Sequence, residues 1–142
     1  MIENLMRLRT RNTRGFTLVE LMVVVGILAI LSVFAVPSYL RYGLRARRVD
    51  AHQALLSIAM AQERYYAAHN RYANNLADIG FTKGMSEKGY YHLDVSGDSA
   101  TFTAFALPAA GGLQENDDCQ SLKINQLGDK TSARSTSNGS CW

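Results

Sequence analysis

The chain has 142 residues, enough for one small globular domain and little more. Its formal net charge of +3 lies entirely in the first 15 residues, where four arginines face one glutamate, while residues 16–142 hold 11 basic and 11 acidic groups. The alkaline pI is therefore a property of the N-terminal segment. It does not indicate a basic nucleic-acid-binding domain.

A long apolar stretch follows this basic segment. Residues 16–36 contain a single charge, Glu20, and 21 residues of helix at about 1.5 Å per residue reach roughly 30 Å, the thickness of a bilayer's hydrocarbon core. A secretory signal has a shorter apolar core and a small-x-small cleavage site near its end, and this stretch has neither. The pattern therefore predicts a membrane anchor rather than a conventional signal peptide.

Basic residues flank the anchor on both sides. The arginines before it favour an N-terminus in the cytoplasm, by the positive-inside tendency. Arg41, Arg45, Arg47 and Arg48 follow the anchor and compete with that orientation. We expect the short N-terminal stretch to dominate, which places the N-terminus inside.

Glu20 is unusual in such a stretch. A carboxylate in a spanning helix costs a few kcal/mol and is by default a functional residue with a partner. The alternative is that Glu20, about one turn from the helix end, reaches the lipid headgroups. The physical argument alone leaves both interpretations open.

Pro37 marks the end of the apolar stretch. It has no backbone N–H to donate and its ring crowds the carbonyl of Val33, so we expect the helix to be kinked or loosened there.

From residue 38 to about residue 70 the pattern remains helical. One stripe is mostly apolar, and it should pack under a small sheet; its members are Leu44, Ala51, Leu55, Ile58, Gln62 and Tyr65. The opposite face is expected to carry polar residues, among them Arg45, Arg48, His52 and Glu63. The arginine cluster of residues 41–48 either contacts lipid headgroups and acidic neighbours or is simply a solvated face.

A connecting segment of about residues 71–89 comes next. Asn75 is followed three residues later by Asp78, which resembles a capping arrangement for a short helical turn that ends at Gly80.

The hydrophobic period then changes to two. Tyr91, Leu93 and Val95 alternate with polar residues, residues 96–99 form a turn signal, and residues 101–107 are expected to form the returning strand. Further on, residues 122–125 alternate again, and a turn at 127–130 leads to a short fourth strand or an irregular tail. The Ser/Thr-rich residues 131–140 are expected to form an exposed loop. The predicted fold is α+β, with one long helix packed on an antiparallel sheet of three or four strands.

The two cysteines are Cys119 and Cys141. If this domain lies outside the cytoplasm they should pair, closing a loop of about 20 residues and stabilising the fold by about 3 kcal/mol. In the cytoplasm they would be two free thiols.

No catalytic or metal-binding set is present in the sequence. His52, His69 and His92 are far apart and none has the spacing of a metal motif. Residues 116–118, Asn-Asp-Asp, either supply oxygens to calcium or are solvated, and Asn138-Gly139-Ser140 is either a glycosylation sequon or a turn. We therefore expect a protein that is not an enzyme and that uses no cofactor or metal.

The junction around the start of the apolar stretch is a specific motif. Residues 14–20, Arg-Gly-Phe-Thr-Leu-Val-Glu, with Pro-Ser-Tyr at 37–39, resemble the type IV pilins and the related type II secretion pseudopilins. The resemblance is strongest over residues 14–72. It implies a leader peptide at 1–15, a membrane-spanning assembly helix at 16–37 and a globular pilin domain at 38–142 with a C-terminal disulfide loop.

The resemblance also implies roles for single residues. Gly15 is the last leader residue, where a prepilin peptidase would cut, and Phe16 would become an N-methylated N-terminus. Glu20 would then pair with the Phe16 amine of a neighbouring subunit, and Pro37 would lie at the helix kink. Before assembly the subunit would span the inner membrane once, with its C-terminal domain in the periplasm. The implied partners are other pilin subunits, the prepilin peptidase/N-methyltransferase and the inner-membrane assembly platform, which together deliver the subunit to an extracellular pilus.

The C-terminal part resembles the small PilE-like and ComP-like minor pilins, through Cys119, residues 122–128 and Cys141-Trp142. The expected function is a minor pilin that supports pilus biogenesis, twitching motility, adhesion or DNA uptake. One alternative is a competence pilin that binds DNA phosphates through Lys123, Lys130 and Arg134, although the neutral charge of residues 16–142 weighs against it. The other alternative is a type II secretion pseudopilin.

Overall fold

The computed structural model describes residues 15–136 and 139–142 of the chain. The predicted leader, apart from Gly15, and Asn138 of the predicted sequon lie outside these residues. The chain divides into two compact units, residues 1–37 and residues 38–142, which are described separately.

One helix, α1, runs from Leu18 to His69 and so belongs to both units. In the first unit its apolar side chains lie exposed, from Leu18 through Val36. Within the described residues, α1 is the one helix that is long and apolar enough to cross a membrane, by length and composition. Pro37 lies inside the helix, and its expected effect on the direction of the helix stays a prediction.

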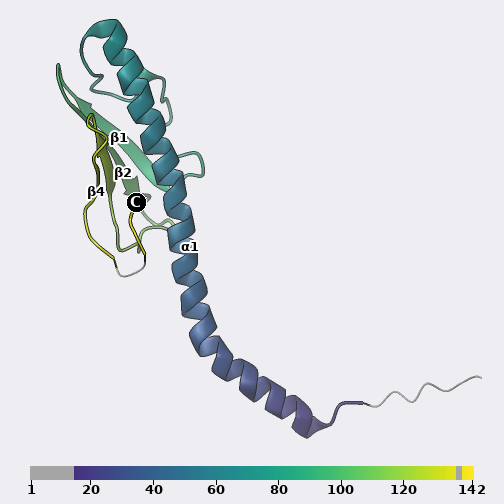
Figure 1. The fold of residues 1–142 in the computed structure, drawn as a ribbon. Helices are drawn as coiled ribbons and strands as arrows, with labels where there is room; N and C mark the ends of the chain where they lie inside the picture. The colour runs from purple at the N-terminus through teal and green to yellow at the C-terminus, as the bar shows by residue number, and fades with distance from the viewer. Residues whose placement is uncertain (1–14, 137–138) are drawn as a thin grey trace, which may run out of the picture. The chain divides into compact units, whose positions relative to one another are not determined.

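In the second unit, α1 lies along one face of a sheet (Figure 1). The predicted apolar stripe is confirmed over its middle: Ala51, Leu55 and Ile58 are fully buried in the core, and Gln62 is buried beside them. Its two ends, Leu44 and Tyr65, are half-buried. Gln62 binds both backbone groups of Ala73, donating to its carbonyl at 2.8 Å and accepting from its N–H at 2.8 Å. The helix therefore also fixes the start of the segment that leads to the sheet.

This connecting segment contains the predicted bond between Asn75 and Asp78, although the residue directly before the short helix is Leu76, which makes no side-chain cap bond. The Asn75 side chain accepts from the Asp78 N–H at 2.9 Å, ahead of a short 3₁₀ helix, η1 (Ala77–Ile79). Gly80 follows in the left-handed region with φ of 89°, which glycine adopts without steric cost. The turn that the sequence predicted to end at Gly80 is confirmed.

The sheet has four strands in the order β1-β2-β3-β4, and every neighbouring pair is antiparallel. Their bounds are β1 (Tyr91–Gly97), β2 (Phe102–Pro108), β3 (Leu122–Asn125) and β4 (Lys130–Ser132). The fold class and the fourth strand are as predicted. The stretch expected to be a loop from residue 131 differs at its start, because residues 131 and 132 pair with β3.

The core lies between this sheet and α1. Inward residues of the strands alternate with outward ones, and the inward set packs on the helix: Tyr91, Leu93, Val95, Phe102, Ala104, Ala106, Leu122 and Ile124. The small residues Ala104 and Ala106 on the central strand β2 let the helix approach the sheet. The period-two pattern of the sequence thus places the core correctly.

Candidate functional site

The predicted processing residues precede α1. Gly15, Phe16 and Thr17 lie outside any helix, and the Phe16 side chain is 84% exposed. A Cβ built on Gly15 would meet no atom within 4 Å. Packing within the described residues therefore gives no reason for a glycine at this position.

Thr17 and Glu20 form the start of α1. The Thr17 hydroxyl accepts from the Glu20 backbone N–H at 3.2 Å, and the Thr17 carbonyl accepts from the Leu21 N–H at 3.2 Å. Thr-x-x-Glu is the capping-box pattern, in which the residue at the cap satisfies a helix N–H that has no partner within the helix. The Thr17-x-x-Glu20 spacing is a signal of this cap in the sequence, in addition to the charge of Glu20. The capped first turn holds Glu20 at a fixed place next to Phe16.

The apolar part of the first unit forms no core of its own. Large side chains such as Leu21, Ile30 and Phe34 are 61%, 66% and 73% exposed. An exposed apolar surface that runs along a whole helix marks a contact with a membrane or with other proteins.

In the second unit the predicted disulfide is confirmed. Cys119 and Cys141 are bonded, with Cα atoms 5.7 Å apart, and neither thiol is left unpaired. Cys119 is fully buried in the core, so the bond joins residues 140–142 to the sheet and helix.

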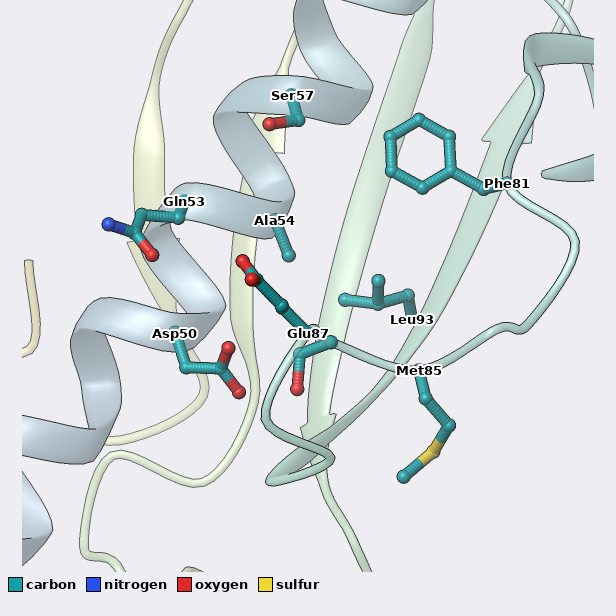
Figure 2. Close-up of a pocket in the computed structure, with 9 residues that line it drawn as sticks. Asp50, Gln53, Ala54, Ser57, Phe81, Met85, Glu87 and Leu93 are labelled. Atoms are coloured by element: carbon teal, nitrogen blue, oxygen red, sulfur yellow. The ribbon is translucent and has the colours of Figure 1, made fainter.

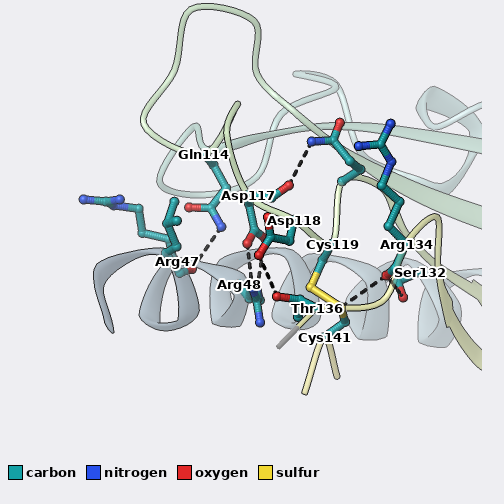
Figure 3. A network of polar contacts seen from close by, with 12 residues as sticks. Arg47, Arg48, Gln114, Asp117, Asp118, Cys119, Ser132, Arg134, Thr136 and Cys141 are labelled. Atoms are coloured by element: carbon teal, nitrogen blue, oxygen red, sulfur yellow. Dashed lines mark hydrogen bonds and ion pairs between the residues drawn. A yellow bond between two sulfur atoms is a disulfide. The ribbon is translucent and has the colours of Figure 1, made fainter. Parts of the chain in front are cut away.

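A buried ion pair lies beside the disulfide (Figure 3). Arg48 of α1 donates from Nε and Nη2 to the two oxygens of Asp117, at 2.9 and 2.6 Å, and both side chains are almost fully buried. Arg48 also donates from Nη1 to the Ser140 carbonyl at 2.9 Å. The carboxylate of Asp117 raises the pKa of Arg48 above its ordinary value. The planar guanidinium with two parallel bonds is the strong, geometrically specific form of such a pair.

This ion pair corrects two expectations. Arg48 does not belong to the polar face of the helix, and Asp117 is not simply solvated, because each is the other's partner in the interior. Arg47, placed in the same cluster, lies over the ring of Tyr90 at 5.7 Å. The spacing contained a signal for Arg48: it lies four residues after Leu44 and three before Ala51, within the apolar stripe.

His52 and Trp142 form a second contact between the helix and the disulfide region. Their rings stack with centroids 4.7 Å apart, and His52 Nε2 lies 2.8 Å from the Cys141 carbonyl. A carbonyl only accepts, so Nε2 carries the proton. Trp142 donates its indole N–H to the Thr131 carbonyl at 2.8 Å. Burial lowers the pKa of His52, and the nearby cations Lys130 and Arg48 lower it further. The hydrogen bond to the Cys141 carbonyl raises this pKa, but by less than burial lowers it.

The three residues suggested for DNA contact are not brought together on one face. Lys123 lies between the inward residues Leu122 and Ile124, so it is on the outer face of the sheet, where it contacts the ring of Phe105. Lys130 lies directly opposite the inward residue Ile124 on the neighbouring strand, so it is on the helix side of the sheet, where it lies over the ring of Trp142. Arg134 is exposed beyond β4. A single phosphate-binding patch made from these three residues does not match this arrangement.

Two family models match the chain. Residues 37–123 match the model described as type IV minor pilin ComP, DNA uptake sequence receptor. Residues 10–36 match the model of the prokaryotic N-terminal methylation motif. The first match ends at Lys123, so Lys130, Arg134 and Cys141 lie beyond it.

Two of the curated relatives are named as major pilins. The type IV major pilin protein PilA of Myxococcus xanthus is 35% identical over 74% of this chain and 49% of its own length. The type IV major pilin protein PilE of Neisseria gonorrhoeae is 33% identical over 64% of this chain and 54% of its own. The chain thus spans about half the length of these relatives.

Solved structures show the same fold. A type IV pilin from Shewanella oneidensis has a TM-score of 0.50 and 24% identity, covering 70% of this chain and 97% of its own. The Neisseria meningitidis minor pilin PilV has a TM-score of 0.52 and 21% identity, covering 70% and 94%. With the family models matching from residue 10 to residue 123, the chain belongs to the type IV pilin family.

Proposed function

We propose that this chain is a minor, non-catalytic subunit of a type IV pilus. The observation that carries the proposal is the exposed apolar segment of α1, which begins with a capped Glu20 and overlaps the matched methylation motif. Such a surface has to be covered first by lipid and then by other apolar helices. The second unit, which has its own core, would be carried on the filament surface.

Maturation of the subunit begins with cleavage after Gly15. A residue without a side chain suits a confined cleavage subsite, and nothing in the described residues explains Gly15 otherwise, which supports this role. The same enzyme then methylates the Phe16 amine. In this proposal the N-terminus faces the cytoplasm and residues 38–142 face the periplasm, where the disulfide forms.

Assembly would pair Glu20 with the Phe16 amine of a neighbouring subunit. Either charge alone is costly in an apolar bundle, and pairing the two offsets that cost and fixes the axial position of each helix. Thr17 supports this pairing because its hydroxyl orders the turn between the two charges.

Intact-mass spectrometry of the chain purified from membranes tests maturation. The expected product starts at Phe16 and carries one added methyl group. A product that retains residues 1–15, in cells with an active prepilin peptidase, would contradict the proposal. Quantifying the chain in sheared filaments then tests the minor role, which is wrong if this subunit dominates the filament.

DNA uptake is a second candidate, because the matched family model is described as a DNA uptake sequence receptor. The arrangement of Lys123 and Lys130 argues that any such contact uses other residues as well. A gel-shift titration of the full chain in detergent tests it. Binding that weakens with salt would support DNA contact, and the absence of a shift at low salt would reject it.

The pseudopilin alternative gains no support. Its expected calcium ligand Asp117 is already bonded through both oxygens to Arg48. Among the described residues, no group of three His, Cys, Asp or Glu side chains is placed to hold a metal.

A further inference from the structure

A small cavity of about 180 Å³ lies in the second unit between α1 and the segment that leads into β1 (Figure 2). Two walls enclose it. The helix contributes Asp50, Gln53, Ala54 and Ser57, and the segment leading into β1, with the start of β1, contributes Phe81, Met85, Ser86, Glu87 and Leu93. Drug-sized ligands occupy larger pockets, of about 300 Å³ and more. This cavity fits a group of the size of one side chain.

Two carboxylates line this cavity. Asp50 extends from α1 toward the loop, and Glu87 extends from the loop toward α1 (Figure 2). Glu87 is exposed, whereas Asp50 is only 4% exposed. No cationic side chain is among the residues that line the cavity.

The buried carboxylate is only half satisfied. Asp50 Oδ1 accepts from the Lys88 backbone N–H at 3.2 Å, but Oδ2 has no hydrogen-bond partner among the described residues. Leaving a buried charged oxygen unpaired is costly, and buried acids in proteins are normally paired with a cation or a donor. A positively charged donor placed in the cavity would satisfy this oxygen.

The rest of the cavity selects the kind of cation. The side chains of Ala54, Phe81, Met85 and Leu93 make part of its wall apolar, and an aromatic ring such as Phe81 attracts a cation at its face. A Ca²⁺ or Mg²⁺ ion would need about six or more oxygen ligands and would gain nothing from an apolar wall. An alkyl stem that ends in an ammonium group suits both parts of the cavity.

We propose that this cavity binds a primary alkylammonium group, with Asp50 and Glu87 holding the charge and Phe81, Met85 and Leu93 contacting the stem. Two sources carry that chemistry: the lysine side chain of a neighbouring subunit and a small free amine. The site is separate from the Glu20 segment, which lies in the first unit. Its assignment does not depend on filament assembly.

The first experiment titrates the full chain in detergent with n-butylamine at neutral pH, followed by NMR of the backbone amides of Ser57, Ser86 and Leu93. We expect saturable shifts at these amides. Asp50→Asn should weaken binding about 10-fold or more, since hydrogen bonds to charged groups carry that much affinity. Asp94→Asn is the matched control: it removes an exposed carboxylate from the outer face of β1, and should leave the affinity within about twofold.

Two results would overturn the proposal. One is the absence of saturable shifts, as expected if Asp50 Oδ2 takes its bond from the buried Tyr91 hydroxyl. The other is an equal affinity of Asp50→Asn and Asp94→Asn. Should Asp50→Asn not fold, Glu87→Gln at the exposed rim takes its place, and unchanged binding in that variant counts against the site.

The second experiment identifies the source. Carbodiimide treatment of sheared filaments joins a carboxylate to an amine in contact with it, and mass spectrometry locates the bond. A Glu87–lysine link between two subunits assigns the cavity to a neighbouring copy. Butylamine binding without such a link assigns it to a free amine. Because the titration uses the unassembled subunit, a failure of assembly cannot be mistaken for a failure of the site.

Discussion

The two units of this pilin place their polar and apolar groups in opposite ways. In the first unit, apolar side chains from Leu18 to Val36 are exposed along a helix that has no core. In the second, a charged pair, Arg48 and Asp117, is buried beside a disulfide. The first unit is thus completed by contacts with other molecules. The second is completed by contacts within the chain, and changes in the two units should have separable effects.

The largest effect is expected from Glu20→Ala. If Glu20 pairs with a neighbour's amine, its loss leaves a buried charge unpaired, and incorporation into sheared filaments should fall by about 100-fold or more. The measurement is the ratio of subunit in filaments to subunit in membranes.

Thermal unfolding of the second unit should not change in this variant, because Glu20 lies in the other unit. The control is Glu63→Gln, an exposed change on the same helix in the second unit. If the Glu20→Ala subunit assembles normally, the first unit does not depend on a Glu20 contact with a neighbouring subunit.

The second largest effect concerns the buried ion pair. Asp117→Asn leaves the Arg48 guanidinium buried without a counter-charge and should lower the free energy of unfolding by about 3–5 kcal/mol. Denaturant unfolding of the full chain in detergent measures it.

A double variant sharpens the interpretation. Arg48→Met with Asp117→Leu removes both charges and should recover part of the lost stability, since a buried ion pair is often replaceable by apolar side chains. Asp94→Asn, an exposed change, should stay within about 0.5 kcal/mol of the unmodified chain. If Asp117→Asn is equally mild, the second unit does not depend on this pair.

Removing the disulfide should cost somewhat less. Cys119→Ser with Cys141→Ser reopens a loop of 22 residues and is expected to lower stability by about 3 kcal/mol. The same denaturant measurement applies, and fluorescence of Trp142 should report its release from His52. If the Trp142 fluorescence of this variant is unchanged, residues 140–142 are held by the noncovalent contacts alone.

The smallest effect is a pH dependence of the second unit. Burial lowers the pKa of His52, so the unfolded chain binds more protons near its ordinary pKa of about 6.5. The stabilisation from neutral His52 is complete above that pH and is lost as the pH falls below it, through the lower pKa of the folded chain. His52→Phe keeps a ring against Trp142 and should flatten the dependence of the melting temperature on pH between about 5 and 7, whereas His92→Gln, an exposed change, should not.

The sequence predicted those parts of the structure that depend on residues close together in the chain. The alternation in residues 91–95 and 122–125 predicted the strands, and Asn75 with Asp78 predicted the cap before Gly80. The disulfide could be predicted because the chain has only two cysteines. The strands and the cap depend on interactions over a few residues. The disulfide has only one possible pairing.

The sequence did not predict the contacts whose partners are far apart. Arg48 lies at apolar spacing, but its partner is 69 residues away in a loop that has no period. The half-satisfied Asp50 is likewise recognisable only once the segment before β1 has closed over it. A charged residue in an apolar stripe signals burial, and which group satisfies it depends on the tertiary structure.

The contacts of Arg48 and His52 with the disulfide region also set the order of events in biosynthesis. The hydrogen bonds from Arg48 to Ser140 and from His52 to Cys141 join residues 92 and 89 positions apart. At synthesis rates of about 5–20 residues per second, this part of the helix waits roughly 5–20 s for its partners. The strands that cover the core face of the helix are made earlier, so the groups left open during that interval are Arg48 and His52. Closure by residues 140–142 is therefore the last step that completes the second unit.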